Sequence, residues 1–240
     1  MITIQGKLIL SSENILELDD LMRRYSSCKR YVYQRLLEGK ERNELKREIP
    51  ALFKINSRYV DDAIMEATGL IKSIEEKGQD PQKIIFGGKP LHHRLSKKHL
   101  SLPQQEEQKA RWREKRQGTL YSRGDKSKKG NLNLRVVRQN NQYILRVNLG
   151  KDRTWIHVPF QSQHKKISFF NDTLEAGLPY NVRLIKRDSN VYIHKQPQSW
   201  KFHADHKTVS ALSLASLMSL TCASACFSHL PFSDGPNFQD

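Results

Sequence analysis

The hydrophobic pattern of this chain changes period twice, and the order of the changes restricts the fold. Residues 2–10 show apolar side chains at every second position, which predicts a strand with one buried face. Residues 13–117 mostly follow helical spacing, and the alternation returns at about residues 120–195. Because a lone strand is not stable, the first strand must pair with strands that follow the helices. The pattern therefore predicts an α+β fold in which helices are inserted into one β-domain.

The insert is expected to contain four helices and one short strand. The helices are expected at residues 13–38, 41–48, 57–78 and 92–117, and the strand at 83–86. Gly39 is expected to end the first helix, and Pro50 to break the second. Ser57 is a suitable N-cap for the third helix. Asp61 and Asp62 fall in its first turn, where we interpret them as complementing the helix dipole rather than as a catalytic pair.

Several short strands follow the insert. The alternating segments are 132–137, 143–148, 156–160, 180–187 and 191–194, with turns at 139–142, 150–152 and 188–190. Short strands at regular spacing with polar turns are typical of an antiparallel barrel or sandwich. We therefore predict a β-domain from residues 1–12 plus 120–197, a helical insert at 13–119, and an atypical tail at 198–240.

The chain is strongly basic, and the excess charge is unevenly placed. The formal net charge is +16 and the pI is about 9.8. Residues 201–240 contain two lysines and three aspartates, which leaves +17 for residues 1–200. Such an excess attracts polyanions through phosphate contacts and counterion release. We favour nucleic acid over a membrane surface, for which no basic amphipathic helix stands out; a merely solvated basic surface is the simpler alternative.

One predicted helix concentrates this charge around a tryptophan. Its basic residues are Lys109, Arg111, Arg113, Lys115 and Arg116, and Trp112 lies among them. This composition suits a helix that follows a phosphate backbone and stacks one base on the indole. It equally suits a solvated helix whose tryptophan anchors it to the core, and the sequence leaves both interpretations open.

A series of short motifs resembles one known family. The motifs are Gln5-Gly6-Lys7-Leu8, Phe86-Gly87-Gly88-Lys89, Trp112-Arg113-Glu114-Lys115-Arg116, Ser122-Arg123-Gly124-Asp125, residues 129–135, the aromatic strand at Trp155 and the hairpin at 178–193. In this order they resemble the N-terminal half of transposon-encoded TnpB (OrfB) proteins, which are relatives of the type V CRISPR effector nucleases. The resemblance covers about residues 1–197.

The resemblance implies a fold, partners and contacts. It implies a wedge-like, oligonucleotide-binding-like β-barrel with a helical recognition insert, which together hold guide RNA and the guide–target duplex. The partners expected are therefore guide-type RNA and DNA. The charged helix and the motifs together give the expected nucleic-acid-binding residues, which are Lys89, Lys109, Arg111, Trp112, Arg113, Lys115, Arg116, Arg123, Lys126, Lys128, Lys129, Asn131 and Arg135.

The nuclease of that family has no counterpart in the sequence. The family's RuvC-like domain begins where this chain reaches about Gln198, and neither its acidic residues nor its four-cysteine zinc site follows. Metal-assisted cleavage needs carboxylates to hold the metal. We therefore expect a truncated relative that is not an enzyme and has no catalytic residue, metal or cofactor. A separate chain that supplies the nuclease lobe would then be a further partner. A pseudogene product without a stable core and a standalone basic RNA- or DNA-binding module are the alternatives, and an intact nuclease ranks last.

The last segment, residues 198–240, does not continue the family pattern, and we interpret it as an out-of-frame tail that is expected to be disordered. Residues 209–230 lack charge and are long enough to span a bilayer, but serine and threonine occur throughout, so we disfavour a span. A zinc site is equally disfavoured because the intervening run is apolar. Its ligands would be His203, His206, Cys222 and Cys226.

Three cysteines and an N-terminus without a signal peptide predict a cytoplasmic protein.

Overall fold

The computed structural model describes residues 3–95, 101–150, 154–165, 167–187 and 190–197. The helices are α1 (Ser12–Leu37), α2 (Arg42–Phe53), α3 (Ser57–Glu75), α4 (Lys89–Leu95), α5 (Leu102–Gln117) and α6 (Ile167–Glu175), with short 3-10 turns η1 (Pro81–Lys83) and η2 (Lys126–Lys128). The strands are β1 (Ile4–Leu8), β2 (Thr119–Ser122), β3 (Gly124–Asp125), β4 (Gly130–Asn131), β5 (Leu134–Gln139), β6 (Gln142–Asn148), β7 (Trp155–Gln161), β8 (Tyr180–Arg187) and β9 (Asn190–Pro197). The predicted α+β class and the order of strand, helices and strands are confirmed.

The described strands form one antiparallel sheet and a small two-stranded pair. The order of the seven-stranded sheet is β2-β8-β9-β1-β7-β6-β5, and β3 pairs with β4. β1 lies in the middle, where Gly6 is opposite Ile193 of β9 and Lys7 is opposite Gln161 of β7. The first strand therefore pairs with strands that follow the insert. The edge strands β2 and β5 do not pair with each other in the described residues, so no backbone ladder closes the sheet and the closed barrel stays a prediction.

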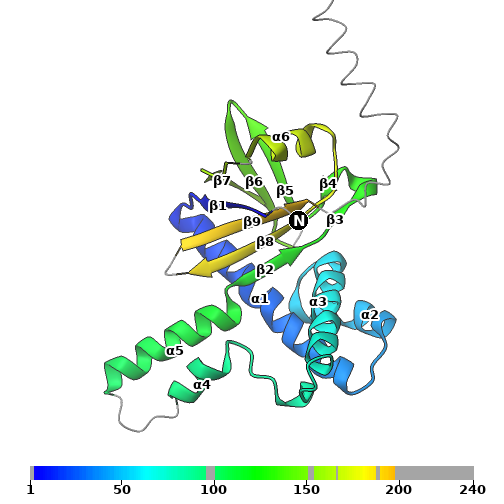
Figure 1. The fold of residues 1–240 in the computed structure, drawn as a ribbon, viewed down its shortest axis with the longest axis vertical. Helices are drawn as coiled ribbons and strands as arrows, with labels where there is room; N and C mark the ends of the chain where they lie inside the picture. The colour runs from blue at the N-terminus through cyan, green and yellow to red at the C-terminus, as the bar shows by residue number, and fades with distance from the viewer. Residues whose placement is uncertain (1–2, 96–100, 151–153, 166, 188–189, 198–240) are drawn as a thin grey trace, which may run out of the picture. The chain divides into compact units, whose positions relative to one another are not determined.

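Helices α1 and α3 attach the insert to the sheet. Tyr25 of α1 and Tyr59 of α3 are buried and meet edge to face, with ring centroids 6.0 Å apart. The Tyr59 hydroxyl donates to the carbonyl of Asn148 in β6 at 2.9 Å, and Ser26 Oγ donates to the carbonyl of Gln117 at 3.0 Å, where α5 meets β2. Buried side chains of helices and strands form one cluster. Figure 1 shows α1–α5 gathered beside β2 and β8, whereas α6 lies beside β5–β7.

Two expected helix boundaries differ in the structure. The prediction that Pro50 breaks the second helix is wrong, because α2 continues to Phe53. Pro50 lies in the last turn, so its missing N–H removes one hydrogen bond at most, and Lys54 ends the helix with a left-handed φ of 50°. The N-cap of α3 is Asn56 rather than Ser57, because the Asn56 side chain accepts the capping hydrogen bond.

The expected strand at residues 83–86 is not formed. Pro81–Lys83 makes the turn η1, and residues 84–86 have no described strand beside them to complete a ladder. The apolar side chains serve the helices instead, because Phe86 packs edge to face on Tyr33 of α1 with ring centroids 5.3 Å apart.

The single helix expected at residues 92–117 is two helices. α4 begins earlier, at Lys89, and α5 begins at Leu102, with Ser101 as its N-cap in a capping box with Gln104. Pro103 stands in the first turn of α5, where a proline needs no intrahelical partner. Residues 96–100 lie outside the described part of the chain.

Helix α6 is not predicted by the alternation, because nine residues are too few to show a helical period clearly. Its Phe170 is buried and meets Tyr180 of β8 edge to face at 5.3 Å. Its Asn171 accepts a hydrogen bond of 2.6 Å from the Tyr143 hydroxyl of β6. α6 therefore contacts β8 and β6, which lie next to the two edge strands of the sheet.

Candidate nucleic-acid interface

Helices α4 and α5 bring together seven of the predicted binding residues. Lys89 lies at the start of α4, and the other six are Lys109, Arg111, Trp112, Arg113, Lys115 and Arg116 of α5. The side chains of Lys89, Arg111, Arg113 and Lys115 are exposed. α5 has no buried residue, so its charged faces are available to a partner.

Trp112 joins the two helices and is not an open stacking surface. Its ring lies 5.8 Å from the His92 ring of α4, and the Arg116 guanidinium lies over it at 4.8 Å from the centroid. The Gly87 backbone is so close that a Cβ added there would lie 2.7 Å from the indole nitrogen. Of the two interpretations that the sequence left open, the structure supports the anchor. Gly87-Gly88 has a packing role, because both glycines have positive φ and Gly87 admits the indole.

The cations of α5 fall into two groups. Lys109 pairs with Glu106 and Arg111 with Glu107, each at 2.7 Å within the helix. Arg113 and Lys115 have no ion pair with a carboxylate of the described residues, and the same holds for Lys89 of α4. These three exposed cations are the ones that could contact phosphate without first breaking a pair.

A basic groove runs between α5 and the end of β8. Its volume is about 470 Å³, and its charged lining is Arg111, Glu114, Lys115, Lys186 and Arg187. Lys186 and Arg187 are absent from the predicted binding residues. They end the alternation of β8, so the sequence showed them as strand residues, and only the packing of α5 against β8 places them beside α5.

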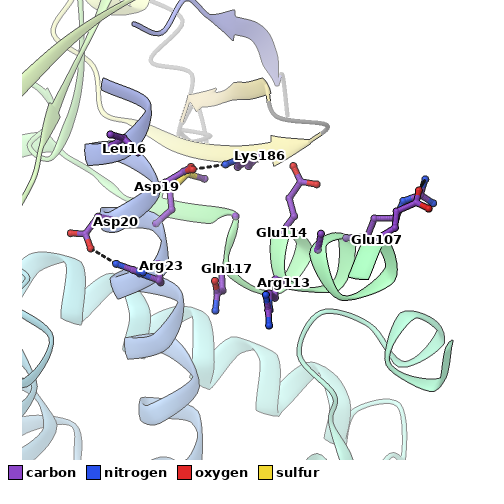
Figure 2. A pocket seen from close by; sticks show the side chains of 13 residues that line it. Leu16, Asp19, Asp20, Arg23, Glu107, Arg113, Glu114, Gln117 and Lys186 are labelled. Carbon is purple, nitrogen blue, oxygen red and sulfur yellow. Dashed lines mark hydrogen bonds and ion pairs between the residues drawn. The ribbon is translucent and has the colours of Figure 1, made fainter. Parts of the chain in front are cut away.

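A second groove, of about 580 Å³, separates α1 from α5 and is shown in Figure 2. Its charges are largely neutralised within the chain. Asp19 pairs with Lys186, and Asp20 pairs with Arg23 at 2.8 Å. Four acidic and four basic residues line this groove, so it has no net charge, although the unpaired Arg113 is among them.

The Arg123-Gly124-Asp125 motif fastens the sheet to α3. The Arg123 guanidinium pairs with Asp61 at 3.2 Å, and its backbone N–H donates to Asp62 at 3.2 Å. Asp125 pairs with Arg58 of α3 at 3.0 Å. Arg123 is thus occupied inside the domain, which argues against its predicted role in nucleic-acid binding. The expectation that these two aspartates complement the dipole of α3 is wrong, because α3 has no acidic residue in its first turn. They bind this motif instead.

Asp62 is buried, with an exposed fraction of 0%. Burial raises the pKa of this carboxyl to about 6, although the hydrogen bond from Arg123 opposes the shift. A buried acid with a raised pKa can mark a proton-transfer site. Here its neighbours are the structural Arg123 and Ser122, and the described residues around it form none of the grooves named above.

Asn131 is a structural residue rather than a surface one. Its exposed fraction is 1%, and its Nδ2 donates to the carbonyls of Ser122 and Tyr180 at 2.9 and 3.3 Å. Its Oδ1 accepts from the backbone N–H of Leu134 at 2.8 Å. This side chain satisfies backbone groups between the edge strands, which argues against its predicted contact with nucleic acid.

The remaining predicted residues form a separate basic surface. Lys126, Lys128 and Lys129 lie exposed on η2 and the turn after it, and Arg135 is exposed on β5. β2 lies between this surface and the α4–α5 pair, as Figure 1 shows. The structure therefore does not bring the predicted residues into one site but into two.

Charge pairing distinguishes these two surfaces from the helices α1–α3. Seven of the ten lysines and arginines in α1–α3 form ion pairs with carboxylates of the described residues, against two of seven in α4–α5. On the second surface Lys128, Lys129 and Arg135 have no such pair. Uncompensated charge is thus concentrated where the sequence predicts contacts with nucleic acid.

The residues that the structure describes contain no group of three or more histidine, cysteine or acidic side chains that could hold a metal ion. None of the described helices is long and apolar enough to cross a membrane. The segments considered above for a zinc site and for a membrane span, at 203–226 and 209–230, lie outside the described residues.

The fold defines a class of protein, an α+β domain in which helices are inserted after the first strand of an antiparallel sheet. The chain belongs to the family described as the SSO2105 N-terminal domain, whose model matches residues 1–199. That description names a domain and no activity. No curated protein and no solved structure matches the chain.

Proposed function

We propose that this domain binds RNA and DNA through their phosphates, as a relative of the N-terminal half of TnpB (OrfB) proteins that has no nuclease centre of its own. Guide-type RNA is the partner that the resemblance favours, and a separate chain could supply a nuclease lobe. The three cysteines, of which Cys28 is buried and free, favour the reducing cytoplasm as the place of action.

One observation carries the proposal, and it is the contrast in charge pairing. A lysine or arginine that is paired with a carboxylate contributes little to a polyanion-binding field, whereas an unpaired one attracts phosphate and releases counterions. Arg113 and Lys115 project from α5 without a pair, and Lys89 is their neighbour on α4. Arg187 in the basic groove also has no carboxylate partner among the described residues.

The finer fold belongs to the same proposal. A wedge-like, oligonucleotide-binding-like barrel would require β2 and β5 to approach each other. Asn131 and Tyr180 support this arrangement, because the Tyr180 hydroxyl accepts from the Val136 N–H at 2.8 Å while Asn131 binds the carbonyl of Ser122 in β2. Side chains would then bridge the gap that the backbone ladder leaves.

The test replaces the three unpaired cations by glutamine and measures RNA affinity. A control variant replaces three paired cations in the same way. The triple variant Lys89→Gln, Arg113→Gln, Lys115→Gln should bind a short single-stranded RNA at least about tenfold more weakly than wild type at about 0.1 M salt, because three phosphate contacts are lost. Affinity is measured by fluorescence anisotropy of the labelled RNA.

The control variant is Arg23→Gln, Arg35→Gln, Lys40→Gln, which removes the same charge from cations that are paired with Asp20, Glu38 and Glu44. It should bind within about threefold of wild type, because only the long-range field changes. Equal loss in both variants, with unchanged thermal unfolding, would show that net charge alone attracts RNA and that α4–α5 is not the site.

A further inference from the structure

Three strands of the sheet place cationic side chains in one row. Arg135 of β5 is opposite Arg146 of β6, and Arg146 is opposite His157 of β7. The next residues along the strands, Val136 and Val158, are buried in the core. Since side chains alternate between the faces of a sheet, the row lies on the face away from the core.

The row is electrostatically unfavourable by itself. Like charges directly opposite each other in a sheet destabilise the pair. Neither arginine has an ion pair with a carboxylate of the described residues, and Arg146 Nε is buried without a hydrogen-bond partner. An anion placed between the two guanidinium groups would remove the repulsion and would accept their hydrogen bonds.

An aromatic ring lies on the same face. Trp155 of β7 is opposite Asn148 of β6, two residues along from the Arg146–His157 pair, so its side chain shares the face of the row. The Arg146 guanidinium lies over the indole at 5.3 Å from the ring centroid. Trp155 is half-buried, and a planar cation stacked on an indole is a surface on which an unpaired base can stack.

We propose that this face, defined by Arg135, Arg146, Trp155 and His157, is a subsite for single-stranded nucleic acid. One phosphate lies between Arg135 and Arg146, and the adjoining base stacks on the Arg146–Trp155 pair. Neighbouring strands are about 4.8 Å apart, so the row spans roughly 10 Å, the scale of one or two nucleotides. Single strands are favoured over duplex because only an unpaired base can leave its partner to stack.

The subsite rests on the proposed function but uses different residues from the α4–α5 pair. The positive charge of the row suits any polyanion, and the Arg146–Trp155 pair beside it favours one that also carries planar rings. Trp112, which the sequence offered as the stacking residue, is covered by His92 and Arg116, whereas Trp155 has only the contact with Arg146 among the described aromatic and cation–π contacts.

The experiment follows Trp155 by fluorescence. The double variant Trp112→Phe, Trp200→Phe keeps Trp155 as the only tryptophan of the three in the sequence. Titration with short oligouridylate and oligothymidylate should quench its emission along the same binding curve that anisotropy gives for the labelled strand. Replacing Arg146 by Gln in this background should weaken binding by about fivefold or more and reduce the quench, because a stacked base and a phosphate contact are lost.

The matched control is Arg138→Gln, which removes the same charge from the neighbouring strand β5 at a guanidinium that donates to the Asn141 side chain. It should leave the quench intact. A second test variant, Arg135→Gln at an exposed position, guards against misfolding of the Arg146 variant and should also weaken binding.

The outcomes separate this inference from the proposed function. If the strand binds with unchanged Trp155 emission, and the α4–α5 triple variant still weakens binding, the subsite is overturned and the proposed function stands. If no strand binds at all, both are overturned. Equal effects of Arg138→Gln and Arg146→Gln would also overturn the subsite, because they would reduce it to general charge.

Discussion

Lys195 of β9 is the residue whose environment is hardest to reconcile with a charged side chain. Its exposed fraction is 0%, and its Nζ has no hydrogen-bond partner in the described residues. Phe170 and Phe160 lie 4.0 and 4.2 Å from the ammonium group, and Tyr143 lies at 5.3 Å. Burial lowers the pKa of Lys195 to about 7, and three aromatic faces compensate only part of the lost hydration.

This lysine predicts a specific pH dependence of stability. Its pKa is about 7 in the folded chain, against about 10.4 when unfolded, so the unfolded chain binds more protons between these values. The free energy of unfolding should therefore rise with pH above 7, by on the order of 2 kcal/mol up to pH 9 for this group. Lys195→Met should remove this rise and should be more stable than wild type at neutral pH. The measurement is urea unfolding at several pH values; a difference between the two proteins that is independent of pH would contradict the assignment.

At the scale of elements, the short strand β3 decides how the helices meet the sheet. Asp125 of β3 and Arg123, which directly precedes β3, are paired with α3, and Gly124 lies against β8. A Cβ added at Gly124 would lie 2.5 Å from the backbone nitrogen of Tyr180 and 2.7 Å from its carbonyl oxygen. Neither backbone atom can move aside without disturbing the sheet.

Gly124→Ala should therefore destabilise the domain by about 1–3 kcal/mol, as overpacking against backbone usually does. Gly69→Ala is the matched control, because Gly69 is exposed in α3 and an added Cβ there meets nothing within 4 Å. The control should be neutral or more stable by up to about 1 kcal/mol, since alanine favours a helix. Thermal unfolding checks both; equal melting temperatures for the two variants would show that β3 is not closely packed.

The elements also show what the sequence could predict. The first strand, the long helix α1 and the β5–β6 hairpin follow from periodicity and turn residues alone; Asn140 and Asn141 both adopt positive φ in the hairpin turn. The sequence placed the first strand in one β-domain with the strands after the insert, but its particular partners β7 and β9 were not predicted.

The parts that failed depend on contacts between distant residues. Asn131 and Arg123 have polar side chains in a basic stretch, and nothing in that stretch indicates that Ser122, Tyr180 and Asp61 satisfy them. For the same reason, the sequence could not show whether Trp112 stacks on a base or anchors its helix. The ion pairs of Lys29, Arg42, Lys46 and Arg58 likewise join different elements, so the sequence alone does not show that these cations are paired.

At the scale of the whole domain, the positive charge is divided between two surfaces on either side of β2. The row on β5–β7 extends the second of these surfaces, because Arg135 belongs to both. We thus expect α4–α5 to contact phosphates and the sheet face to contact both phosphates and bases. The affinity of each surface should depend on salt in proportion to its phosphate contacts.

The most direct test of the central claim is the salt dependence of single-stranded RNA binding between about 50 and 200 mM. The logarithm of the association constant should fall linearly with the logarithm of the salt concentration, with a slope of about 0.7 for each phosphate contacted. The triple variant at Lys89, Arg113 and Lys115 should have a slope smaller by about 2, and the paired-cation control should keep the wild-type slope. Binding that is independent of salt, or equal slopes in all three proteins, would contradict the proposal that this domain holds nucleic acid through the unpaired cations of α4 and α5.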